Sequence, residues 1–68
     1  MDKWTKIYTT RNYTQASIIK GMLEENNIPV TVMNKLDSSY LSFGDIEVYV
    51  AKEFAALAAS LINKSLMN

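Results

Sequence analysis

The 68-residue sequence contains no cysteine and no histidine, and only one proline and two glycines. These absences exclude disulfides, thiol nucleophiles and imidazole bases, and they remove the usual zinc ligands. Domains below about 70 to 80 residues usually add a disulfide, a metal or a partner subunit, because their own core supplies only about 3–5 kcal/mol. With the first two options removed, the sequence predicts a single domain that self-associates.

The sequence also lacks an excess of positive or negative charge, and it lacks long apolar runs. Seven Lys and Arg residues balance seven Asp and Glu residues, and no run of basic residues occurs, which disfavours nucleic acid as a partner. No apolar run is long enough to span a membrane, and the opening MDKWTKIY has no apolar signal core. We therefore expect a cytoplasmic protein without a membrane partner, and the lack of cysteine fits a reducing compartment.

The carboxylates do not form a recognisable catalytic or metal-binding group. Glu24 and Glu25 are adjacent on a predicted helix, so they diverge, and Lys20 four residues before Glu24 is typical of a solvated face. The other acidic residues considered are dispersed along the chain: Asp37, Asp45, Glu47 and Glu53. We therefore expect no enzyme activity, no metal site and no cofactor.

The first half of the chain predicts a strand and then a helix. Residues 4–10 alternate and are rich in aromatic and β-branched residues, as in a strand. Asn12, with Gln15 three residues later, has the spacing of a helix N-terminal capping box. The helix should end at Asn26 or Asn27, since Asn tolerates the left-handed conformation and Pro29 follows.

The second half predicts two strands and a second helix. Residues 29–34 form a short strand opened by Pro29. Residues 45–50 form the clearest strand, with Ile46, Val48 and Val50 on one face. Residues 52–66 then form an amphipathic helix whose apolar stripe is Phe54, Leu57, Ala58, Leu61 and Ile62.

This order predicts an α+β, ferredoxin-like βαββα fold. The first two strands should be parallel and the third should pair antiparallel between them, which gives a three-stranded antiparallel or mixed sheet with two helices on one face. The fourth strand of that fold would lie beside the first strand, which is therefore left as an edge. The strand residues expected to face the helices are Ile7, Val30, Val32, Ile46, Val48 and Val50.

Several segments together resemble one known family. The opening WTKIYTT, the helix end IIKGMLEENNIPV, the segment SSYLSFGDIEVYV and the Ala-rich last helix are similar to DUF2007, a family of small bacterial domains labelled as signal-transducing. The resemblance covers nearly the whole chain and rests on the order and spacing of the segments. It implies a PII-like ferredoxin fold without an established ligand. This chain has Asn26 and Asn27 where a glycine helix stop is expected, and it lacks the cysteines of the zinc ribbon in some longer relatives.

The loop NKLDSSYLSFG is a candidate ligand site. Hydroxyl groups gather there and a glycine permits a turn, so a small anion or metabolite could bind. The predicted ligand-binding residues are Ser38, Ser39, Tyr40 and Gly44. The alternative is a plain connector in which Leu41 and Phe43 tuck under a helix and the serines cap turns.

The sheet face turned away from the helices is the second candidate. If Ile7 points inward, alternation turns Trp4 and Tyr8 outward, and exposed aromatics in that number indicate an interface. We expect the chain to self-associate through its unpaired first strand, through this face, or through both. The predicted interface of the homo-oligomer, most simply a dimer, is Trp4, Lys6, Tyr8, Met33 and Tyr49. An RNA-stacking platform and a face covered by a chain terminus are the alternatives.

These expectations combine into one functional hypothesis. We expect a small non-enzymatic regulatory or signal-transducing module that acts as a homo-oligomer, with an unknown ligand. The regulatory role is implied by the family resemblance and by no single residue. The alternatives are a ligand-free protein interaction module and a weak single-stranded RNA binder.

Overall fold

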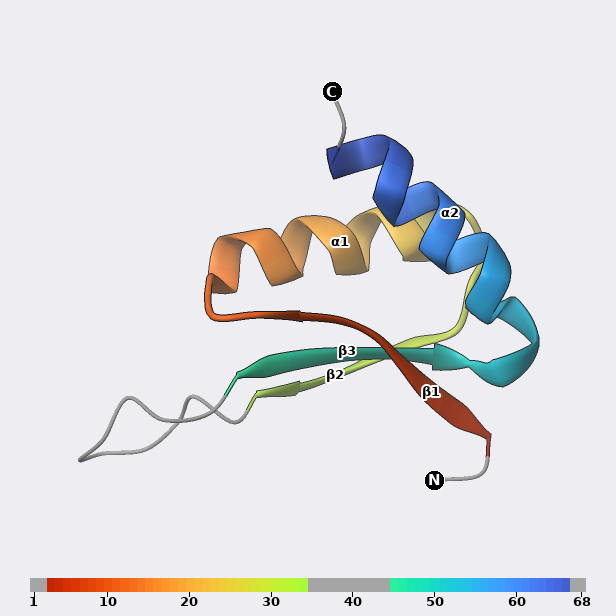
Figure 1. Cartoon of the computed structure of the whole chain (residues 1–68), viewed down its shortest axis with the longest axis horizontal. Coiled ribbons are helices and arrows are strands. Elements are labelled where there is room, and N and C mark those ends of the chain that lie inside the picture. Colours follow the sequence, from red (N-terminus) through yellow and green to blue (C-terminus); the bar gives the residue numbers. More distant parts are fainter. Residues whose placement is uncertain (1–2, 35–44, 67–68) are drawn as a thin grey trace.

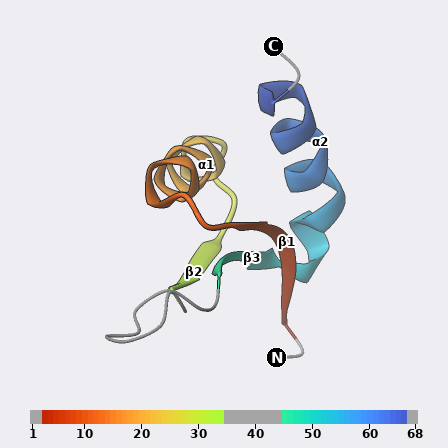
Figure 2. The same cartoon turned by 60° about the vertical axis from the view of Figure 1, so that its left-hand side comes forward.

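One three-stranded sheet forms a layer, and two helices cover one of its faces (Figure 1, Figure 2). The computed structural model describes residues 3–34 and 45–66. Its elements are, in chain order, β1 (Trp4–Thr10), α1 (Tyr13–Glu25), β2 (Val30–Asn34), β3 (Ile46–Ala51), a 3-10 turn (Lys52–Phe54) and α2 (Ala55–Leu66).

The strand order in the sheet is β1-β3-β2. β3 pairs antiparallel with both neighbours, so β1 and β2 run parallel to each other on either side of it. The expected α+β, ferredoxin-like βαββα fold is confirmed, with an antiparallel sheet. β1 and β2 are consequently the two edges of the sheet in the part of the chain that the structure describes.

Asparagines define both ends of α1. At the start, the Asn12 side chain accepts a hydrogen bond from the Gln15 backbone N–H at 3.1 Å, as the capping spacing predicts. At the end, Asn27 adopts φ 60°, its N–H donates to Glu24 C=O, and the next N–H, of Ile28, donates to Leu23 C=O. This is a Schellman motif, in which Asn27 takes the left-handed position that glycine usually occupies.

The core lies between β3 and the helices. Val48 and Val50 on β3 are buried and pack in one cluster with Ile19 and Leu23 of α1, and Ile46 on β3 is buried as well. The partly buried strand residues packed against this cluster include Ile7, Val30 and Val32. The predicted inward face of the sheet is therefore confirmed.

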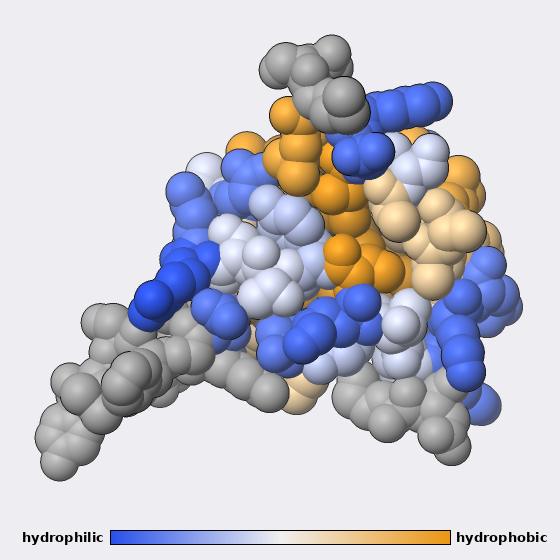
Figure 3. All heavy atoms as spheres, in the orientation of Figure 1, coloured by the Kyte–Doolittle hydropathy of each residue, from blue (hydrophilic) through white to orange (hydrophobic). Residues whose placement is uncertain are grey.

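α2 packs less completely than its sequence predicts. Ala58 and Ile62 are buried, whereas Leu57 is half exposed, so its place in the inward stripe was wrong. Figure 2 shows that α2 rises away from the sheet toward the C-terminus instead of lying along it. Figure 3 shows apolar surface gathered where α1 and α2 meet, and Leu66 near the end of α2 is also exposed.

A β-bulge changes the face on which Tyr8 lies. Lys6 pairs with Tyr49, but Tyr8 pairs with Val48, so the register shifts between Lys6 and Tyr8. Ile7 and Tyr8 then both pack against the core cluster, because a bulge sets two residues of one strand opposite one of the other. The expectation that Tyr8 points outward was wrong, since strict alternation does not hold across a bulge.

Candidate functional site

The predicted ligand-binding residues fall in one segment. Ser38, Ser39, Tyr40 and Gly44 lie outside the described residues. The chain enters this segment after Asn34, at the end of β2, and leaves it at Asp45, just before β3. The loop site therefore stays a prediction, located by its flanks at one end of the sheet.

A groove lies at that same end, between α1 and the strands. It has a volume of about 220 Å³. The residues that line it are Tyr13, Ala16, Ser17, Lys20, Val32, Asn34 and Ile46. We call it the α1–β2 groove. Its floor is apolar, and Lys20, the one charged residue among the described residues of its lining, forms an i,i+4 ion pair with Glu24 at 3.0 Å.

Sequence reasoning missed this groove. The groove depends on how far α1 lies from the edge of β2, and no local pattern encodes that distance. One signal was present: the small residues Ala16 and Ser17 occupy the helix positions above the groove, where larger side chains would fill it.

A second, more open groove lies near the start of β1. Its volume is about 530 Å³, and it is lined by Lys3, Trp4, Pro29, Ala51, Lys52 and Glu53. Backbone hydrogen bonds from Lys52 N–H to Lys3 C=O and from Ala51 N–H to Pro29 C=O fix its walls. Trp4 is only partly exposed here, so its side chain is neither fully solvated nor part of the core.

The open face of the sheet is more polar than predicted. Tyr8 is turned toward the core, so Trp4 and Tyr49 are the aromatic residues of the predicted interface that remain on the open face. Met33 lies on this face at the β2 edge and is 38% exposed. A smaller aromatic surface weakens the resemblance to an RNA-stacking platform, which uses several neighbouring rings.

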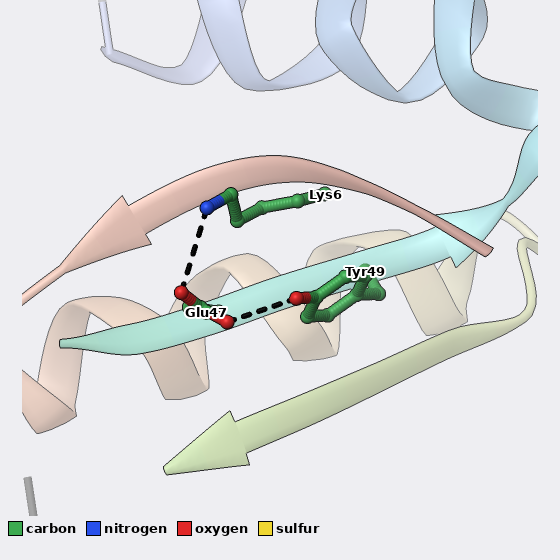
Figure 4. Close-up of polar contacts among 3 residues, drawn as sticks. All are labelled: Lys6, Glu47 and Tyr49. Atoms are coloured by element: carbon green, nitrogen blue, oxygen red, sulfur yellow. Dashed lines mark hydrogen bonds and ion pairs between the residues drawn. The ribbon is translucent and has the colours of Figure 1, made fainter. Parts of the chain in front are cut away.

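Three side chains on that face are joined by hydrogen bonds (Figure 4). Tyr49 OH donates to Glu47 Oε1 at 2.9 Å, and Lys6 Nζ approaches Glu47 Oε2 at 3.4 Å. Glu47 and Tyr49 share a face because they are two residues apart on β3, and Lys6 pairs with Tyr49 across from β1. The Glu47 side chain is only 12% exposed. Both of its oxygens already accept bonds, so the trio joins β1 to β3 as a structural contact.

Two further charged side chains approach each other at the surface. Arg11 and Asp45 approach at 4.0 Å with both side chains well exposed, a kind of pair that contributes little to stability. Among residues 3–34 and 45–66, no three acidic side chains come close enough to hold a metal ion. Neither helix in the described part of the chain has the length and apolar character needed to cross a bilayer.

Comparison with known families agrees with the resemblance seen in the sequence. The sequence profile of one family, described as "Putative prokaryotic signal transducing protein", matches residues 4–65. The chain belongs to the DUF2007 family. The match extends from the first residue of β1 almost to the end of α2, so the DUF2007 domain includes every strand and helix described above. Neither the curated proteins nor the solved structures contain a match to this DUF2007 chain.

Proposed function

We propose that this DUF2007 domain is a small, non-enzymatic regulatory module that acts as a homo-oligomer in the cytoplasm. The observation that carries the regulatory role is the family match over residues 4–65, with its signal-transducing description. The cytoplasmic location stays a prediction from the sequence.

The packing of the chain supports self-association. Its core holds nine buried apolar residues in the described part of the chain, and both outer strands leave one side unpaired there. A domain of this size has a marginal core, and natural proteins pair, cover or protect exposed strand edges. A second copy of the chain would extend the apolar burial and satisfy an edge.

The interface predicted from the sequence changes in one member. Tyr8 packs against the core, so the outward set that stays a prediction is Trp4, Lys6, Met33 and Tyr49. Lys6 is held by Glu47 within one copy, which leaves Trp4 and Met33 as the apolar members.

A ligand panel tests the regulatory role. Thermal unfolding is measured with metabolites and nucleotides, because a ligand that binds only the native state raises apparent stability by RT ln(1 + [L]/Kd). We expect at least one compound to raise the melting temperature, and Tyr40→Ala to abolish the shift. Ser60→Ala on the exposed face of α2 is the control that should retain it.

The same panel separates the alternatives. If no compound raises the melting temperature of the parent protein, the proposal of a ligand-binding regulatory module is unsupported. The ligand-free interaction module is then the better account. If Tyr40→Ala keeps the full shift, the ligand binds elsewhere than in the predicted loop.

A further inference from the structure

We propose that the second copy joins along the outer edge of β2, with a twofold axis at Val32, and not along β1. This inference rests on the proposed homo-oligomer and names its interface. Four observations carry it: the backbone groups that face the β2 edge, the state of the β1 edge, the α1–β2 groove, and the charges on α1.

The first observation is which backbone groups of β2 face outward. Ala51 N–H donates to Pro29 C=O, so Pro29 and Ala51 form a hydrogen-bonded pair. Hydrogen-bonded and non-hydrogen-bonded pairs alternate in an antiparallel ladder. Thr31 therefore bonds to Tyr49 of β3, and the N–H and C=O groups of Val30 and Val32 point to the outer edge.

The two edges differ in regularity. β2 pairs with β3 in one unbroken register over all five residues and carries no charged side chain. β1 carries the bulge between Lys6 and Tyr8, and Lys6 is charged. Bulges and lysines are devices by which proteins protect strand edges from pairing. The structure therefore protects β1 and leaves β2 as the regular edge.

The β2 edge also allows a symmetric register. Antiparallel pairing about Val32 places Thr31 opposite Met33 of the second copy, and Val32 opposite Val32. Because the Val32 backbone groups point outward, the two Val32 residues exchange both hydrogen bonds of a hydrogen-bonded pair. Such an interface is isologous and closes after two copies.

The strand edge alone is too small for a stable dimer, and the groove supplies the rest. A standard interface covers about 800 Å² per partner, roughly one sixth of the 4768 Å² surface of this chain. Val32 lines the α1–β2 groove, together with Tyr13 and Ser17 of α1. A twofold axis at Val32 brings α1 of the second copy next to β2 of the first. The side of that helix that lines its own groove then covers the apolar groove of the first copy.

The charges on the groove-lining side of α1 are complementary to those of a second copy. Lys20 and Glu24 lie one turn apart and carry opposite charges. Two such sides in antiparallel contact have no net charge, and the lysine of one copy can meet the glutamate of the other. A second copy is therefore a better occupant than a strongly charged partner.

Matched lysine substitutions on the two edges test the inference. Met33 and Thr9 are both exposed, and both pair with Glu47, Met33 from β2 and Thr9 from β1. Met33→Lys introduces two cations at the proposed interface, one from each copy, and should weaken dimerisation by about tenfold, which corresponds to 1.4 kcal/mol. Thr9→Lys should leave the dimerisation constant unchanged. Sedimentation equilibrium measures both, and circular dichroism checks that both variants fold.

Amide hydrogen exchange in the parent protein is the second measurement, and it needs no substitution. The Val30 and Val32 amides should exchange more slowly as protein concentration rises. Lys52 N–H donates to Lys3 C=O, so by the same alternation the Trp4 and Lys6 amides face the β1 edge and should show no such dependence. If the parent is a dimer but only Thr9→Lys dissociates it, or only the β1 amides become protected, the β2 interface is wrong and the homo-oligomer stands. If the parent is a monomer, both proposals are wrong.

Discussion

Truncating Leu23 to alanine should remove most of the stability of this domain. Leu23 is fully buried, packs in the core cluster with Ile19 and Ile28, and lies two positions before Glu25, the last residue of α1. Substitution of a buried leucine by alanine costs about 2–5 kcal/mol, from lost burial and from the cavity that remains. A core of this size supplies only about 3–5 kcal/mol, so Leu23→Ala should be largely unfolded at low concentration.

Ile18→Ala provides the matched control. Ile18 lies on the same helix but is 54% exposed, so its truncation should change the free energy of unfolding by no more than about 0.5 kcal/mol. Urea unfolding followed by helical circular dichroism, at one fixed protein concentration, compares both variants with the parent. A Leu23→Ala loss below about 1 kcal/mol, or equal losses in the two variants, would refute the described packing of α1.

Four further results are expected. Asn12→Ala should lower the free energy of unfolding by about 1 kcal/mol through loss of the cap on α1, and a loss near zero in urea unfolding would contradict the capping contact. Asn27→Ala should cost about 1–2 kcal/mol, because the left-handed conformation strains alanine, whereas Asn27→Gly should not destabilise; equal losses would argue against the Schellman motif. Tyr8→Ala should destabilise the fold more than Thr9→Ala, because Tyr8 packs against the core, and the reverse order would place Tyr8 outside. No binding of single-stranded RNA is expected in fluorescence titrations at physiological salt, and micromolar, salt-sensitive binding would overturn the charge argument.

Local patterns were enough to predict the elements of the fold. The cap at Asn12 and the stop at Asn27 act within a few residues, so their positions in the sequence define α1. The alternation of Ile46, Val48 and Val50 identified the central strand, because a strand buried on one face must alternate. The order of the elements then left few ways to arrange three strands and two helices.

Features that depend on long-range geometry were not predictable in the same way. The bulge beside Tyr8 becomes visible only when β1 is aligned with β3, and no residue type near Ile7 indicates a bulge in the sequence. Leu57 is half exposed although its spacing matches an inward stripe. The α1–β2 groove likewise follows from the distance between a helix and a strand edge.

Self-association of the chain stays a prediction, and the structure changes only where its interface is proposed. The unpaired first strand and the small core led to this prediction from the sequence alone. The choice between the two edges required the register: the bulge weakens the case for β1, and the backbone alternation fixed by Pro29 and Ala51 directs Val30 and Val32 outward on β2.

Sedimentation equilibrium of the parent chain over a wide concentration range tests the central claim, self-association, most directly. The chain mass is 7.7 kDa. We expect the apparent mass to rise with concentration toward twice that value and to level off there, because a twofold interface closes after two copies. A mass that stays at 7.7 kDa at the highest concentration, in a protein with native circular dichroism, would contradict the account.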